Sequence, residues 1–168
     1  GHRHPVTTWE TNVMGTINVL EAARSLARPV TVIAVTSDKV YRNREWEYAY
    51  RETDELGGHD PYSASKAACE LAVSSWRASF GGSSKVQVVT ARSGNVLGAG
   101  DMGEDRLVPD CFRAWGADAI VHLRNPNATR PWQHVLDPLS GYIMMAAHVR
   151  SSDLPLTTCN FGPGPQGD

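Results

Sequence analysis

Tyr62 and Lys66 lie four residues apart in a segment whose residue types favour a helix. Two side chains at that spacing share one helix face. A lysine ammonium about 4 Å from a phenol, at an effective dielectric near 20, favours the phenolate by up to roughly 4 kcal/mol. A tyrosine in that setting can act as a general base at neutral pH. The pair alone is more often surface packing, so a second group is needed to support a catalytic role.

Ser37 supplies that second group. The apolar run 30–35 predicts a buried parallel strand, and Ser37, Asp38 and Lys39 follow its end. A hydroxyl at a strand end can hydrogen-bond the substrate oxygen from which a tyrosine removes the proton. The combination therefore indicates proton transfer at a substrate hydroxyl.

The helix that carries Tyr62 has clear boundaries in the sequence. Asp60 is a suitable N-cap and Pro61 suits the first helical position. The helix is expected to run to about Phe80, where Gly81 and Gly82 stop it. The connection 42–59 before it is long and aromatic, and a functional loop and a surface excursion are equally good interpretations.

Strands and helices alternate along the rest of the chain. A capping box at Thr7 and Glu10 predicts a helix over 9–26. Further strands are expected at 86–91, 120–123 and 157–161, and helices at 105–115 and 137–150. In the last helix, five side chains are predicted to face inward: Leu139, Tyr142, Ile143, Ala146 and Val149. The order predicts an α/β fold, the second half of a Rossmann-type parallel sheet with part of a small substrate-binding lobe.

Two loops are candidates for ligand binding. The segment 92–100 is glycine-rich and follows a strand, and ligands of open α/β sheets bind outside the carboxyl ends of strands. Glycines alone are equally well explained by a turn. The loop 124–134 contains Arg130, whose guanidinium geometry matches phosphate oxygens.

Composition excludes several classes of protein. The 168 residues are 41% hydrophobic and 20% charged, which is ordinary for a globular domain. A net charge of −2 gives no general attraction to nucleic acid or anionic membranes. The three scattered cysteines indicate a reducing compartment, and no residue pattern predicts a metal site. We therefore expect a cytoplasmic protein without a membrane or nucleic-acid partner.

Beyond these features, the chain resembles the nucleotide-sugar branch of the extended short-chain dehydrogenase/reductases. Ser37, Tyr62 and Lys66 match the Ser/Thr-Tyr-Lys set of that family. Within the branch, the similarity is greatest to the CDP-glucose 4,6-dehydratases, and it covers nearly the whole chain. The matching stretches are Thr11–Thr16, Thr36–Tyr41, Asn43–Trp46, Leu56–Gly58, Asp60–Ser63, Gly94–Val96, Asp105–Asp110 and Arg130–Val135.

The resemblance implies an NAD-dependent hydro-lyase that converts CDP-D-glucose to CDP-4-keto-6-deoxy-D-glucose and water. It implies catalytic roles for the residues of the strand end and the helix: Ser37, Asp38, Lys39, Tyr62 and Lys66. Lys39 departs from the glutamate of the dTDP-glucose dehydratases and fits the CDP-glucose type.

The resemblance also implies ligand contacts outside the catalytic set. Asn12 and Arg92 would lie with Tyr62 and Lys66 at the nicotinamide end of the cofactor. Asn95 and Arg130 would bind the substrate diphosphate. Members of the family are expected to be homo-oligomers, dimers or tetramers.

Two other functions remain open from the sequence. One is a dTDP-glucose 4,6-dehydratase or a 4-epimerase or reductase of the same superfamily, although such epimerases usually carry small or hydroxyl residues where Asp38 and Lys39 stand. The other is a non-catalytic nucleotide-binding scaffold. The chain also has no glycine-rich turn with an acidic residue about 20 positions later. We therefore expect residues 1–168 to be a partial domain that lacks the N-terminal glycine-rich βαβ unit and the C-terminal end.

Overall fold

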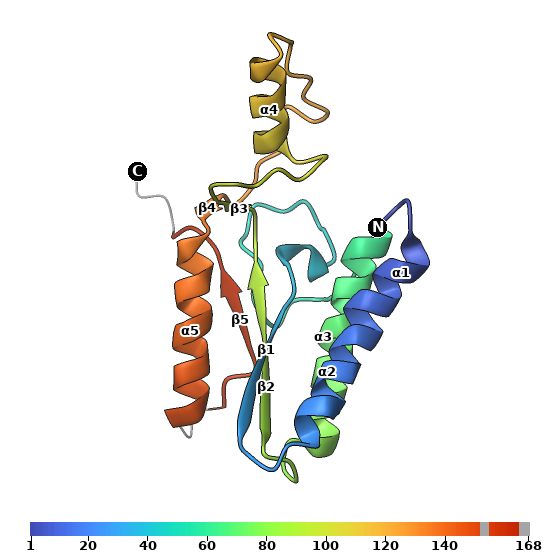
Figure 1. The fold of residues 1–168 in the computed structure, drawn as a ribbon, viewed down its shortest axis with the longest axis vertical. Helices are drawn as coiled ribbons and strands as arrows, with labels where there is room; N and C mark the ends of the chain where they lie inside the picture. The colour runs from blue at the N-terminus through green and yellow to red at the C-terminus, as the bar shows by residue number, and fades with distance from the viewer. Residues whose placement is uncertain (152–154, 165–168) are drawn as a thin grey trace.

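The computed structural model describes residues 1–151 and 155–164. A parallel sheet lies between two layers of helices (Figure 1). Its strands are β1 (Val30–Val35), β2 (Val86–Ser93) and β5 (Thr158–Phe161), with β2 in the centre. All three strands point toward the part of the molecule that carries α4. The predicted α/β fold with a parallel sheet is confirmed.

The first helical stretch runs through three labelled elements without leaving the helical conformation. These are α1 (Pro5–Trp9), a π-helical turn η1 (Glu10–Met14) and α2 (Gly15–Arg24). The predicted capping box is wrong, because His4 is the N-cap and Pro5 occupies the first helical position. Proline suits that position, since its φ is already helical and its missing N–H would have no partner there. The helix therefore begins before Thr7, which lies inside it.

Helix α3 (Pro61–Phe80) covers the same face of the sheet as α2. Asp60 caps it as predicted: one carboxylate oxygen accepts the backbone N–H groups of Tyr62 at 2.9 Å and Ser63 at 3.1 Å. The core on this side combines apolar side chains from both helices and from β2. They are Leu20, Ala23, Cys69, Val73, Trp76, Val86 and Val88.

Helix α5 (Leu136–Ser151) covers the opposite face. Its inward row is Gly141, Met145 and Val149, which recur every four residues. A Cβ on Gly141 would lie 2.1 Å from Cε1 of Phe161, so the glycine allows the helix to approach β5 closely. That approach sets the rotation of the helix about its axis.

The predicted inward face of α5 is therefore only partly right. Val149 is buried, and Tyr142 packs against Phe161 with ring centroids 5.1 Å apart. Leu139 and Ile143 point outward, and Ile143 is 72% exposed. The apolar pattern predicted one inward set, and the close approach of Gly141 to β5 turns the helix away from it.

A smaller lobe lies beyond the carboxyl ends of the strands. It holds α4 (Leu107–Gly116) and a short parallel ladder of β3 (Val96–Leu97) with β4 (Gln133–His134). The predicted strand at 120–123 is wrong: no ladder hydrogen bond is formed there, and Ile120 is 80% exposed. β-Branched residues favour a strand only where another strand is available to pair with it. Within the described ranges, no helix is both long and apolar enough to span a membrane.

Candidate active site

Ser37 lies where β1 ends and the short 3₁₀ turn η2 (Asp38–Val40) begins. Its hydroxyl is 3.0 Å from Oδ1 of Asp38 and accepts the backbone N–H of Lys39 at 3.2 Å. These bonds hold the hydroxyl, the carboxylate and the lysine on a single turn. Ser37 is buried, Asp38 is half-buried and Lys39 is exposed.

Lys66 reaches the same strand end from α3. Its Nζ donates to the carbonyl oxygen of Val35 at 3.1 Å, two residues before Ser37. Tyr62 precedes Lys66 by one helical turn, and its side chain is 38% exposed. The structure thus brings Lys66 to the strand end that carries Ser37 and Asp38, with Tyr62 one helical turn before it.

Asn12 supports the first turns of α3. Its Nδ2 donates to Oγ of Ser65 at 2.8 Å, and Ser65 Oγ donates to the carbonyl oxygen of Tyr62 at 2.8 Å. Asn12 lies in the π-helical turn η1, and such turns are frequent at functional sites. The bond ties the first helical stretch to the helix of Tyr62 and Lys66. The contact of Asn12 with a cofactor stays a prediction.

Arg92 has protein partners at all three guanidinium nitrogens. Nε and Nη2 donate to the carboxylate of Glu70 at 3.0 and 2.9 Å. Nη1 donates to the Tyr41 hydroxyl at 2.8 Å and to the Glu52 carbonyl at 3.0 Å. Burial alone would lower the pKa of Arg92, but the bonds to Glu70 and Tyr41 outweigh it and raise the pKa. A cofactor contact of Arg92 stays a prediction and would compete with these partners.

The two predicted diphosphate ligands lie on neighbouring loops. Asn95 precedes β3, and its backbone carbonyl accepts the N–H of Gln133 at 3.0 Å. Its side-chain Oδ1 is buried and has no hydrogen-bond partner among the described residues. Arg130 is exposed, and among the described residues its Nη1 donates to the carbonyl of Thr129 alone, at 2.7 Å. A buried acceptor and an exposed guanidinium on adjoining loops are compatible with a shared polar ligand.

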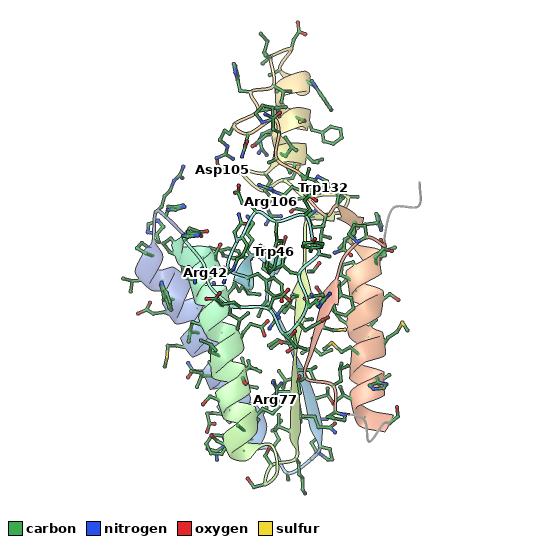
Figure 2. All side chains as sticks on the ribbon, turned by 180° about the vertical axis from the view of Figure 1, so that it is seen from behind. Arg42, Trp46, Arg77, Asp105, Arg106 and Trp132 are labelled. Carbon is green, nitrogen blue, oxygen red and sulfur yellow. The ribbon has the colours of Figure 1, made fainter. Side chains whose placement is uncertain are left out.

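Figure 2 shows Trp132 and Arg106 where the α4 lobe meets the end of the sheet. The glycine at position 94 has a packing reason in this region, because a Cβ there would lie 2.5 Å from Cγ of Pro131. The two ligand loops are therefore packed against each other directly.

Sequence reasoning missed Glu70, which is buried and central to the site's support. A signal existed: Glu70 follows Lys66 by four residues, so it lies on the inner face of α3, where a carboxylate needs partners. Tyr41 was missed for a different reason, since its partners Arg92 and Asn160 are far away in the chain. Burial raises the pKa of Tyr41, so its hydroxyl stays protonated and donates to Asn160.

The model of the NAD dependent epimerase/dehydratase family matches residues 1–158. The chain belongs to this family. It is 44% identical over 168 residues to a CDP-glucose 4,6-dehydratase of Salmonella typhimurium, an alignment that covers 96% of the chain and 47% of that protein. It is 27% identical over 154 residues to a UDP-glucose 4-epimerase of Mycoplasma genitalium, and this alignment covers 86% of the chain and 44% of that protein.

Among solved structures of the family, a dTDP-glucose 4,6-dehydratase from Bacillus anthracis in complex with NAD superposes with a TM-score of 0.78 at 22% identity. That match covers 92% of the chain and 47% of the neighbour, and it shows the shared fold. The chain spans about half the length of the curated relatives it matches.

Proposed function

We propose that the protein carrying this chain is an NAD-dependent nucleotide-sugar 4,6-dehydratase. The proposed reaction converts CDP-D-glucose to CDP-4-keto-6-deoxy-D-glucose and water. One observation carries the proposal: a carboxylate, Asp38, shares a turn with Ser37 at the strand end to which Lys66 is bonded. Proton abstraction needs only Ser37, Tyr62 and Lys66, whereas elimination of water also needs an acid. The 44% identity to a CDP-glucose 4,6-dehydratase supports the choice of nucleotide.

The first proton leaves the C4 hydroxyl of the sugar. Tyr62 accepts it as the phenolate, with the Lys66 ammonium one turn away on the helix. The Ser37 hydroxyl, which donates to Oδ1 of Asp38 in the free chain, turns to donate to the C4 oxygen. The chemistry that NAD supplies when bound is the uptake of hydride from C4 and its return at C6. Among Ser37, Tyr62 and Lys66, Tyr62 is the residue most accessible to a substrate, since 38% of it is exposed.

The elimination uses the other side chains of the turn. With a ketone at C4, the C5 hydrogen is acidic, and its loss is coupled to departure of the C6 hydroxyl. Asp38 protonates that oxygen, which leaves as water. Lys39 is assigned to the C5 proton: it takes this proton as water leaves and gives it back to C5 when hydride is returned at C6. Lys39 must be neutral when it accepts the proton, which requires that the bound substrate exclude water from it.

The residues present fit the nicotinamide end of NAD. Lys66 is bonded at the carboxyl end of β1, and Tyr62 precedes it by one helical turn. Ligands of open α/β sheets bind at this end of the strands, which supports the assignment. Within the segment 94–100, Val96 and Leu97 pair as β3 with β4 and Gly94 packs on Pro131, so we do not assign the pyrophosphate of NAD to this segment. This chain is therefore proposed to hold only the nicotinamide end.

The quaternary state and location follow as further proposals. Val19 and Leu71 are exposed apolar side chains on α2 and α3, which supports a dimer or tetramer of this chain. The cysteines in the described residues are free, which supports a reducing cytoplasm. Light scattering of the purified protein measures the quaternary state. Fluorescence microscopy of a tagged protein shows the location in the cell.

The test is a product assay on the full-length protein. CDP-glucose and dTDP-glucose are supplied separately with NAD, and the sugar product is identified by mass spectrometry. We expect loss of one water from CDP-glucose, and no product with Tyr62→Phe as the matched control. Preferred turnover of dTDP-glucose would overturn the nucleotide assignment. A C4 epimer of unchanged mass would overturn the dehydratase assignment.

A further inference from the structure

Glu70 and Arg92 form an ion pair in the interior of the protein. Glu70 is 4% exposed and Arg92 is 5% exposed. The guanidinium bonds both carboxylate oxygens, at 3.0 Å from Nε and 2.9 Å from Nη2. Two parallel charge-assisted bonds of this kind fix orientation as well as distance.

The same carboxylate accepts two threonine hydroxyls, one from β2 and one from the residue that follows β1. Thr36, directly after β1, donates to Oε1, and Thr90, in the middle of β2, donates to Oε2 at 2.7 Å. Thr36 is also held by its backbone N–H, which donates to the Ala91 carbonyl at 2.8 Å. Glu70 is thereby bonded to the residue that directly precedes Ser37.

Helix α3 therefore holds the end of β1 at two consecutive residues. Lys66 bonds the carbonyl of Val35, and Glu70, one turn later, bonds the hydroxyl of Thr36. The first bond places the lysine that serves Tyr62. The second places the backbone from which Ser37 projects. A shift of Thr36 would change the relation between the strand end and the helix.

We propose that Glu70 is a positioning residue that acts through Thr36. It sets the distance of Ser37 and Asp38 from the Tyr62 and Lys66 side chains, and it does not touch the substrate. Arg92 neutralises the buried carboxylate and completes its orientation. The catalytic consequence rests on the proposed function, since it is the geometry of proton transfer that the contact maintains.

The chain offers a matched pair of variants to test this role. Thr36→Val and Thr90→Val each remove one hydroxyl bonded to Glu70, and both threonines are buried. Only Thr36 adjoins the catalytic turn. A purely structural role for the network predicts similar effects of the two changes, whereas positioning predicts an effect of Thr36→Val alone.

The kinetic measurement uses the full-length protein with CDP-glucose. A misplacement of about 1 Å can cost on the order of a hundredfold in rate, so we expect kcat of Thr36→Val to fall roughly ten- to a hundredfold with KM little changed. Thr90→Val should keep kcat near the wild-type value. Thr36→Ser, which retains the hydroxyl, should restore most of the rate. Equal losses in the two valine variants, or no loss in Thr36→Val, would overturn the proposal.

Hydrogen exchange tests the positioning without relying on the reaction. The amides of Lys39, Val40 and Tyr41 donate to acceptors of Ser37 and Asp38, so their protection reports the order of the turn. We expect exchange in Thr36→Val to be roughly tenfold faster there, and unchanged in Thr90→Val. Unchanged protection in Thr36→Val would refute the positioning role. If the wild-type protein has no activity on CDP-glucose but Thr36→Val still exchanges faster than Thr90→Val, the proposed function is refuted and the positioning role of Glu70 is retained.

Discussion

Replacing Asp38 by asparagine separates the two chemical stages of the proposed reaction. Oδ1 of Asp38 is 3.0 Å from the Ser37 hydroxyl, and an asparagine carboxamide keeps an oxygen that can accept the same bond. The backbone of the turn is held by bonds that do not involve this side chain, from the N–H of Lys39 to Ser37 Oγ and from the N–H of Val40 to the Ser37 carbonyl. Asp38→Asn should therefore preserve the geometry and remove only the acidic proton.

The size of the effect follows from that single loss. General acid catalysis typically contributes about 10²- to 10⁴-fold, which corresponds to roughly 2.7–5.5 kcal/mol in the barrier to elimination. Oxidation at C4 depends on Tyr62, Lys66 and Ser37, so it should keep its rate. In Asp38→Asn, the oxidation stage should then run ahead of water loss.

Rapid mixing of the full-length protein, loaded with NAD, with CDP-glucose measures both stages. The near-ultraviolet absorbance of the reduced nicotinamide follows oxidation, and mass spectrometry follows the dehydrated sugar. We expect absorbance to accumulate in Asp38→Asn and to be absent in Tyr62→Phe, which has no base for the C4 hydroxyl. Wild-type turnover in Asp38→Asn, or an oxidation block as complete as that of Tyr62→Phe, would refute the role of Asp38 as the acid.

Three further predictions concern binding and stability. Arg130→Ala should raise KM for CDP-glucose with kcat nearly unchanged, by an amount equivalent to about 1.5–3 kcal/mol for a charged hydrogen bond; an unchanged KM in steady-state assays would exclude the diphosphate contact. Glu70→Ala leaves the buried Arg92 guanidinium without its carboxylate and should cost about 3–5 kcal/mol in urea unfolding; a loss below about 1 kcal/mol would contradict it. Asp60→Ala removes the cap of α3 and should cost about 1 kcal/mol at neutral pH, again by urea unfolding. Burial tends to raise the pKa of Asp60, but bonds from Ser63 and Tyr62 outweigh it and lower the pKa from its ordinary 3.8. Its stabilising effect is therefore complete above about pH 4 and is lost as pH falls through the folded pKa, and Asp60→Asn should lack this acid-induced loss.

The sequence determined the elements whose signals are local. Asp60 and Pro61 mark the start of α3 through cap chemistry and a preset φ, and these depend on no distant residue. The β-branched residues of β1 and the polar residues at its end are local signals as well. The spacing of Tyr62 and Lys66 places both on one helix face and depends on no distant contact.

The tertiary structure decided everything that depends on a distant partner. The stretch 120–123 is strand-like in composition, but no described strand pairs with it, while the less obvious Gln133–His134 pairs with β3. The inward face of α5 was chosen by the contact of Gly141 with Phe161. Arg92 showed most clearly what a linear pattern omits, because the charge that neutralises it lies 22 residues away on another element. Burying a charge is costly unless a partner is brought into contact with it, and only the folded chain shows that Glu70 is this partner.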